Sequence, residues 1–306
     1  MTRTASTPVY SAASAAAPVL ATGAALAVLA LGLPLAGPAA TLGACAAILL
    51  FGLPHGALDL RLLTQKAPVA RLALYLGLAT AMLLVWRAAP VMALVLFLVM
   101  AVVHFAEDWA ALDEPFLAHG LAGGLLAAPG LLHLDELHGL FAALAGEAEA
   151  ALLGDALRLA APVGLALALV GLAALVRRGE QALAAATGAA LTGLVVLPPA
   201  VGFALYFGLL HSPLHLAAEM PGEAAARRRV WMGAILPMTG LSLLIALALA
   251  RLETRPTVGE TAIAATFMVL SILTTPHMLA PRLIARLEVL RPKLGGDTPL
   301  VRRTRR

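Results

Sequence analysis

Apolar segments of about twenty residues recur along nearly the whole chain, and this repetition most constrains how it can fold. The 306 residues are 61% hydrophobic and only 12% charged, whereas soluble domains have about 25% charged residues. About 20 apolar residues in a helix cross the hydrocarbon core of a bilayer. The runs are continuous rather than alternating, so the sequence predicts an all-α fold, a polytopic transmembrane helix bundle, and not a barrel.

The apolar runs divide the chain into about ten membrane spans, with eight to ten as the expected range. Spans seven and eight are separated by little more than Pro198 and Pro199, so they are either two helices or one broken element. The stretch 135–158 is more acidic, and we expect an interfacial amphipathic helix or a loop there. The ten expected spans cover residues 17–36, 39–59, 72–88, 90–107, 117–134, 159–176, 183–201, 203–218, 230–250 and 260–280.

One transmembrane domain is expected to fill residues 17–280. A short disordered N-terminus, residues 1–16, precedes it, and a basic cytoplasmic tail, residues 281–306, follows it. The small residues after the first apolar segment also fit a cleaved signal peptide. However, the segment before it has a single charge, Arg3, and a second apolar segment follows at once, which favours a retained helix.

Basic residues are distributed unevenly over the loops that these spans define. With the N-terminus inside, 17 of the 21 Lys and Arg residues fall on the cytoplasmic side. Since positive charge is enriched in cytoplasmic loops, the sequence predicts a multi-pass protein of the cell membrane, surrounded by membrane lipids, with both termini cytoplasmic. This topology accounts for the basic balance without a nucleic-acid partner. The single cysteine, Cys45, excludes an intrachain disulfide and disfavours thiolate ligation of a metal.

Five of the eight histidines are predicted to lie at one depth in the membrane. His211 and His215 are four positions apart, which places both on one face of a helix. These two, with His55, His104 and His277, lie toward the ends of even-numbered spans, which all cross the membrane in the same direction. A single buried histidine is usually a hydrogen-bonded core residue, but five at one depth favour a metal site. Neutral imidazoles without cysteine suit Fe(II), Zn(II) or copper.

Carboxylates follow several of these histidines at helical spacing. A metal-bound histidine usually donates its other ring N–H to a carboxylate, which fixes its tautomer. Such acids are candidates to orient the imidazoles, or else they are ordinary residues at the ends of helices. The four acids are Asp59, Glu107, Asp108 and Glu219.

The three remaining histidines are expected to play lesser roles. His119 begins span five on the cytoplasmic side and is a reserve metal ligand. His133 and His138 fall on the opposite side, near the acidic stretch, where structural or interfacial roles are expected.

Four motifs, taken in order, resemble those of the Brp/Blh family of integral-membrane β-carotene 15,15′-dioxygenases. They are Gly-Leu-Pro-His-Gly-Ala-Leu-Asp at 52–59, His-Phe-Ala-Glu-Asp at 104–108, Tyr-Phe and His-Ser-Pro-Leu-His within 206–215, and Thr-Pro-His-Met at 275–278. The resemblance covers most of the chain. It implies a non-haem Fe²⁺ enzyme that cleaves the central 15,15′ double bond of β-carotene with O₂ and gives two molecules of all-trans-retinal.

The same resemblance implies roles for single residues. Carried over by position, the iron ligands would be His55, His104, His211 and His215. His277 matches a family motif and is a candidate additional ligand or site residue.

Aromatic residues near these motifs are candidate contacts of a polyene substrate, although single aromatics also serve ordinary packing. The strongest candidates are Phe105, Tyr206 and Phe207, and Phe51 and Phe267 are further ones.

Three positions depart from the pattern of the family. Ala106 stands where the family tends to have glycine, Leu210 where an aromatic residue is expected, and Leu214 where a basic residue is expected. All three flank expected iron ligands, so they bear on the identity of the carotenoid and of the cleaved bond.

Other functions stay open from the sequence alone. A di-iron membrane hydroxylase or desaturase would need about eight histidines in repeated clusters, and this chain has one HxxxH pair. A transporter would show paired broken helices in two halves, and a haem carrier would leave His55 and His104 unexplained. Another membrane oxygenase, acting on a different carotenoid or apolar lipid, and a non-catalytic carotenoid or retinal binder are the remaining alternatives.

Overall fold

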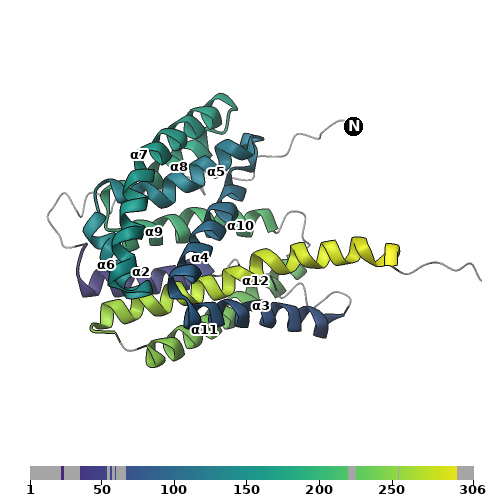
Figure 1. Cartoon of the computed structure of the whole chain (residues 1–306). Helices are drawn as coiled ribbons and strands as arrows, with labels where there is room; N and C mark the ends of the chain where they lie inside the picture. The colour runs from purple at the N-terminus through teal and green to yellow at the C-terminus, as the bar shows by residue number, and fades with distance from the viewer. Residues whose placement is uncertain are drawn as a thin grey trace, which may run out of the picture.

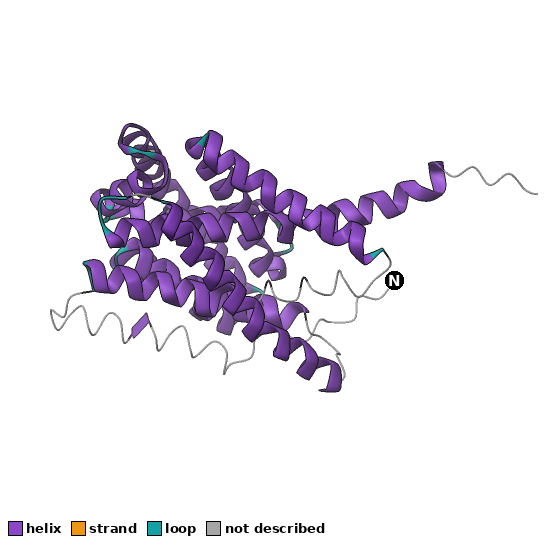
Figure 2. Cartoon of the chain, turned by 90° about the horizontal axis from the view of Figure 1, so that it is seen from below, coloured by secondary structure: helices purple, strands orange, loops and turns teal. Residues whose placement is uncertain are grey.

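The computed structural model describes residues 22–23, 35–53, 56, 59, 67–219, 225–253 and 255–294. Most of the first expected span, the N-terminal residues 1–16 and His55 lie outside this part of the chain. The described residues contain helices and no strand (Figures 1 and 2). The elements are α2 Pro38–Ala47, η1 Ile48–Gly52, α3 Pro68–Ala88, α4 Pro90–Phe105, η3 Ala106–Leu112, α5 Pro115–Ala127, η4 Ala128–Leu131, α6 Leu134–Ala145, α7 Glu147–Arg177, α8 Gln181–Val196, α9 Pro199–Tyr206, η5 Phe207–His211, α10 Ser212–Glu219, α11 Ala225–Leu252 and α12 Val258–Leu294.

Proline sets where many of these helices begin. Five of them, α2, α3, α4, α5 and α9, have proline in their first turn. Proline fits there because the first backbone N–H groups of a helix have no partner within the helix, and because its fixed φ suits the helix start. The apolar sequence between these prolines then continues as helix.

The expectation of a helical membrane bundle is confirmed. Six helices of the described part are long and apolar enough to cross a membrane, and α5–η4 with α6 forms a pair bent by 108° that could add a seventh span. Two shorter apolar helices, Pro38–Gly52 and Gln181–Val196, coincide with further expected spans. The chain is therefore a helical membrane protein whose described part also contains a bent helix pair and two shorter apolar helices.

The acidic stretch 135–158 is helical throughout, apart from a turn at Gly146. It forms α6 and the first part of α7, which pack against each other. Leu137, Phe141 and Leu144 on α6 are buried, whereas Asp135 in its first turn is exposed. Of the two alternatives for this stretch, a loop or an amphipathic helix, the structure contains the helix. Gly146 (φ 106°) permits the turn of the chain from α6 into α7.

Spans seven and eight are two helices packed against each other. The chain turns at Pro198 and Pro199, and Gly202 of α9 comes back against α8. A side chain at Gly202 would begin 3.0 Å from the Gly193 carbonyl oxygen and 3.1 Å from the Leu194 Cα. Glycine therefore permits the close approach of the two backbones, as small residues commonly do between membrane helices.

Helices α3 and α12 lie side by side and antiparallel (Figure 1). Arg71 at the start of α3 pairs with Glu288 near the end of α12 (2.8 Å), and Trp86 near the end of α3 donates to the Ser271 hydroxyl. At 37 residues α12 is about 55 Å long. It continues to Leu294, into the segment that we expect to be a basic tail, and its last turns extend past the other helices (Figure 1).

Charged contacts gather at the two ends of the bundle. At one end Arg282 binds Glu107, and Arg178 lies 3.6 Å from Asp113. At the other end Glu253 contacts both Arg87 and Arg255. The expected separation of basic residues into two groups thus has a structural counterpart, while the end that faces the cytoplasm stays a prediction.

Candidate metal centre

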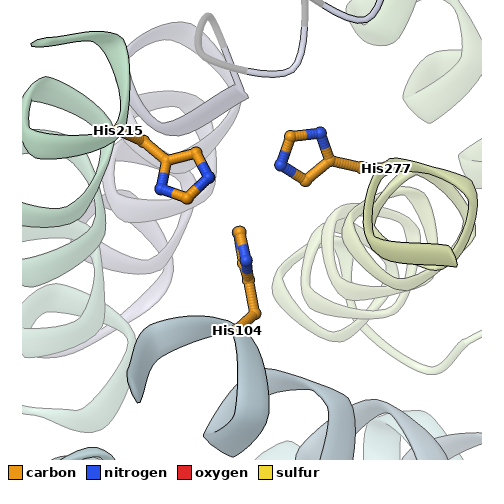
Figure 3. Close-up of side chains that lie close together, drawn as sticks. All are labelled: His104, His215 and His277. Carbon is orange, nitrogen blue, oxygen red and sulfur yellow. The ribbon is translucent and has the colours of Figure 1, made fainter. Parts of the chain in front are cut away.

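Four histidines from α4, η5, α10 and α12 meet in the described part of the chain. The ring centroid of His104 lies 4.8 Å from that of His211, 4.7 Å from that of His215 and 5.1 Å from that of His277. Figure 3 shows the rings of His104, His215 and His277 reaching a common space from three separate helices. The four side chains that we expect at one depth thus lie close together, while their depth in the membrane stays a prediction. His55 lies outside the described residues.

The donor atoms of this histidine cluster suit a metal ion. Ring nitrogens of His104, His215 and His277 lie within 4.8 Å of one another, and so do donor atoms of Asp108, His211 and His215. Ligand atoms of one ion with bonds of about 2.1 Å are at most about 4.2 Å apart, so small ring rotations would bring these nitrogens to one ion. Imidazole nitrogens supported by carboxylates fit Fe(II), Zn(II) or Cu(II). The only cysteine of the sequence, Cys45, is buried in α2 and belongs to neither group.

A buried carboxylate holds His211. The Nδ1 atom of His211 lies 2.9 and 3.1 Å from the two carboxylate oxygens of Asp108, and the Tyr206 hydroxyl donates to the same carboxylate at 3.2 Å. The side chains of His211 and Asp108 are only 0% and 1% exposed. An Nδ1–H donated to Asp108 leaves Nε2 to carry the lone pair that a metal would use.

A second group of the same composition holds His277. Its Nδ1 lies 2.9 Å from Asp59 Oδ1, and the Tyr75 hydroxyl donates to Asp59 Oδ2 at 2.8 Å. The chain thus contains two Tyr–Asp–His groups, Tyr206–Asp108–His211 and Tyr75–Asp59–His277, built from different helices. Each can fix a histidine tautomer with a carboxylate that is itself hydrogen-bonded.

The pairing of acids and histidines differs from the one that helical spacing predicted. Asp108 was expected to serve His104, four residues before it, but the structure places it against His211. The reason is that α4 ends at Phe105 and the chain continues as the tighter 3₁₀ helix η3, with a kink at Trp109 (φ −112°, ψ 33°). Glu107 does lie near His104, at 3.7 Å from Nδ1, and also binds Arg282.

Two other expected pairs involve residues outside the described part. Asp59 was expected to serve His55, which is not described, and its described histidine partner is His277. The side chain of Glu219, expected beside His215, also lies outside the described residues.

Two π-helical turns pack together beside the histidine cluster. Pro213 has no N–H to bond the carbonyl of Leu209, and the preceding turn, η5, widens to a π-helix that includes His211. The other π turn, η1, contacts η5. A Cβ at Gly52 would lie 2.0 Å from the Phe207 ring, so only glycine leaves room for that ring. The close fit of η1 against η5 places Phe207 in a stacked arrangement with His211, at 5.3 Å.

An apolar cavity of about 380 Å³ adjoins the histidines. His104, His277, Asp59 and Tyr75 line it together with apolar side chains of α3, α4, α11 and α12. This volume lies in the range of small-molecule sites, which are mostly apolar with a few placed polar groups. The polar groups of this cavity include two of the clustered histidines.

The expected substrate contacts are distributed unevenly around this cavity. Phe105 and Phe207 line it, and their contact with a substrate stays a prediction. Tyr206 and Phe267 instead line a smaller neighbouring cavity of about 70 Å³, and the Tyr206 hydroxyl is bound to Asp108. Phe51 is 58% exposed on the outside of η1 and lines neither cavity, so its expected role as a polyene contact is not supported.

The three positions that depart from the Brp/Blh pattern are buried away from the large cavity. Ala106, Leu210 and Leu214 are 5%, 0% and 5% exposed and do not belong to its lining. Each stands one or two residues from a clustered histidine in the sequence, so any effect on substrate choice would act through the position of the histidines.

Tyr75 was missed by the reasoning from sequence. It is one of three tyrosines in the chain and stands within an apolar span, four residues after Arg71. A tyrosine hydroxyl buried in a membrane helix needs a partner, and this requirement was the available signal. Its partner, Asp59, is 16 positions earlier and follows no helical spacing.

Comparison with known proteins shows the family to which the chain belongs. A family model described as beta-carotene 15,15'-dioxygenase matches residues 46–284. The chain belongs to the beta-carotene 15,15'-dioxygenase family. A curated relative with the name Beta-carotene 15,15'-dioxygenase, from uncultured marine bacterium 66A03, is 29% identical over 250 residues, which are 74% of this chain and 87% of the relative. No solved structure matches the chain significantly.

The region that matches the beta-carotene 15,15'-dioxygenase family contains all eight histidines, and three of them lie outside the cluster. His119 is exposed on α5, where its Nδ1 lies 2.6 Å from the Pro115 carbonyl oxygen, so the expectation of a reserve ligand is not supported. His133 contacts Glu136, and the His138 ring packs on Gly154 of α7. Both serve helix structure, as expected.

Proposed function

We propose that this protein is a non-haem Fe²⁺ dioxygenase that cleaves the central 15,15′ double bond of β-carotene with O₂ and releases two molecules of all-trans-retinal. The observation that carries the proposal is a cluster of four imidazoles inside a membrane bundle, two of which, His104 and His277, line an apolar cavity. Membership of the beta-carotene 15,15'-dioxygenase family supports the substrate and the bond.

The proposed iron ligands are His55, His104, His211 and His215, with His277 as an additional ligand. His104, His215 and His277 are supported by the closeness of their ring nitrogens, and His211 by its contacts with His104 and His215. The role of His55 as an iron ligand is supported by the sequence motif at residues 52–59 alone. The bound Fe²⁺ would supply the binding and activation of O₂, which organic side chains do not provide.

The two Tyr–Asp–His groups orient the ligands before substrate binds. Asp108 and Asp59 accept the Nδ1–H of His211 and His277, which fixes the tautomer with Nε2 available to a metal. Tyr206 and Tyr75 donate to these carboxylates and restrict their rotation. Such restraint reduces the entropy that metal binding has to remove, and it aligns the donor atoms with one point.

The cavity positions the substrate and excludes water. β-Carotene is a hydrocarbon, so its recognition rests on shape and apolar contact. Phe105 and Phe207 line the cavity next to His104 and offer flat surfaces to a polyene. In the overall reaction the 15,15′ carbon–carbon double bond is broken and each carbon receives one oxygen atom of O₂, so no side chain has to act as a general acid or base.

The proposal predicts that iron and activity depend together on the clustered histidines. His104→Ala and His211→Ala are expected to abolish retinal formation and to lower iron from about one ion per chain, as one metal site implies. Metal analysis of purified variants and chromatography of the retinoids are the measurements. His119→Ala is the matched control, because His119 is exposed outside the cluster. Full iron content in a His104→Ala, His211→Ala double variant would contradict the ligand assignment.

A further inference from the structure

The large cavity reaches the outer surface of the protein between α3 and α11. Leu72 and Leu76 on α3 and Leu241 on α11 all line the cavity. The same side chains are 41%, 54% and 49% exposed, far more than the buried residues deeper in the cavity such as His104 at 3%. A side chain that lines a cavity and is also exposed marks its mouth. We call these three leucines the leucine mouth.

The leucine mouth lies on two candidate membrane-spanning helices. α3 and the described part of α11 are both long apolar helices of the kind that cross membranes. Each packs against α12, and within the described chain they make little contact with each other. The mouth is therefore a lateral opening between α3 and α11, and Arg71, which precedes Leu72, is the charged residue next to it.

The cavity that the leucine mouth opens into is mostly apolar and contains two of the histidines. Met238 and Ile245 of α11 and Leu273 of α12 line it together with His277 and His104. Arg71 also lines the cavity, is only 8% exposed and binds Glu288 near the end of α12. This ion pair places charge where α3 begins, next to the apolar part of the cavity.

We propose that the leucine mouth is the route by which a carotenoid passes from the bilayer to the histidine cluster. The inference rests on the proposed function, because the occupant it names is β-carotene. A hydrocarbon polyene dissolves in the bilayer, and transfer through water would be unfavourable because it would expose the whole apolar surface of the polyene. A lateral opening removes that barrier, and small shifts of α11 against α3 would widen it.

The test compares tryptophan substitutions inside and outside the leucine mouth. Leu76→Trp and Leu241→Trp enlarge side chains at the mouth. Leu84→Trp and Leu244→Trp are matched controls on the same two helices, because Leu84 and Leu244 are 60% and 64% exposed and do not line the cavity. All four substitutions place tryptophan on the lipid-facing surface, so a general effect on insertion would appear in controls and mouth variants alike.

The measurement is the rate at which β-carotene passes from liposomes to the full-length protein in the absence of O₂, followed by the absorbance of the protein-bound pigment. The mouth variants are expected to load on the order of tenfold more slowly, comparable with a steric misfit in an apolar pocket, and the controls at the wild-type rate. Leu76→Ala, which widens the mouth, is expected to load at least as fast as wild type. Iron content measured on each preparation identifies a variant that fails to fold.

The results separate the route from the proposed reaction. Equal loading rates in mouth variants and controls, all with normal iron, would overturn the proposed route even if retinal is formed. Slower loading of the mouth variants than of the controls, together with no retinal formation in air, would instead reject the proposed reaction and leave the route supported. Failure of wild-type protein to take up β-carotene would overturn the inference.

Discussion

Two aspartates each accept a hydrogen bond from a tyrosine and lie within hydrogen-bond distance of a clustered histidine. The sequence identified Asp59 and Asp108 as partners of histidines, because acids at helical spacing from a histidine are visible in the chain. It did not identify the correct partner of Asp108, because η3 departs from α-helical geometry and His211 comes from another part of the chain. Contacts between helices follow from packing, which spacing along one helix does not encode.

At this scale Asp108→Asn is expected to weaken iron affinity by about 10–100-fold, since the carboxylate orients a ligand without binding the metal in the proposed site. Tyr206→Phe is expected to have a smaller effect, because it removes one hydrogen bond worth about 1 kcal/mol. Competition with a calibrated iron chelator measures both. Asp135→Asn, at an exposed aspartate on α6, is the control. Unchanged iron affinity in Asp108→Asn would show that His211 is oriented by other groups.

The helices themselves were largely predictable, and their irregular turns were not. Apolar length and the prolines gave most helices within a few residues, including the two helices joined at Pro198 and Pro199. The π turns η1 and η5 were not foreseen. Pro213 is visible in the sequence, but the fit of the Phe207 ring over Gly52 is a contact between two elements that spacing along the chain does not show. His211 lies in the π turn η5. Its position in the cluster therefore depends on the contact between η1 and η5.

Substitution of one glycine tests this contact. Gly52→Ala is expected to lower thermal stability and iron content, because its Cβ would lie 2.0 Å from the Phe207 ring and force the π turns apart. Gly77→Ala in α3 is the matched control. No atom lies within 4 Å of its Cβ position, and replacement of a helical glycine by alanine generally adds about 0.5–1 kcal/mol of stability. Thermal unfolding in detergent and metal analysis compare the two, and equal behaviour of both variants would contradict the proposed role of Gly52.

At the scale of the whole molecule, the sequence predicted the helical bundle and the separation of basic residues better than the shape of individual spans. The charge count placed most basic residues on one side, and the structure gathers Arg178 and Arg282 at one end and Arg87 and Arg255 at the other. The sequence predicts about ten spans, with eight to ten as the expected range. The described part has six long apolar helices, a bent pair and two shorter apolar helices at nine of the expected positions, and most of the first expected span lies outside it. Hydropathy registers apolar length but not bends, so it did not show which of these elements are bent or short.

The orientation predicts that both ends of the chain are cytoplasmic, since 17 of the 21 basic residues then lie on that side. Fusions of a reporter that is active only in the periplasm, and of one that is active only in the cytoplasm, to each end measure this. Periplasmic activity at the C-terminus would reverse the sidedness of the histidine cluster, although not its geometry.

In the proposed function, β-carotene is cleaved oxidatively at a site formed by these histidines. The most direct measurement supplies ¹⁸O₂ and β-carotene to the iron-loaded protein in bilayer nanodiscs. Rapid reduction of the products with borohydride prevents exchange of the aldehyde oxygen with water, and mass spectrometry then counts the label. The account predicts two molecules of retinol for each β-carotene consumed, each with one ¹⁸O atom, and none from His104→Ala. A wild-type preparation that holds iron and binds β-carotene but gives no labelled retinol would contradict it.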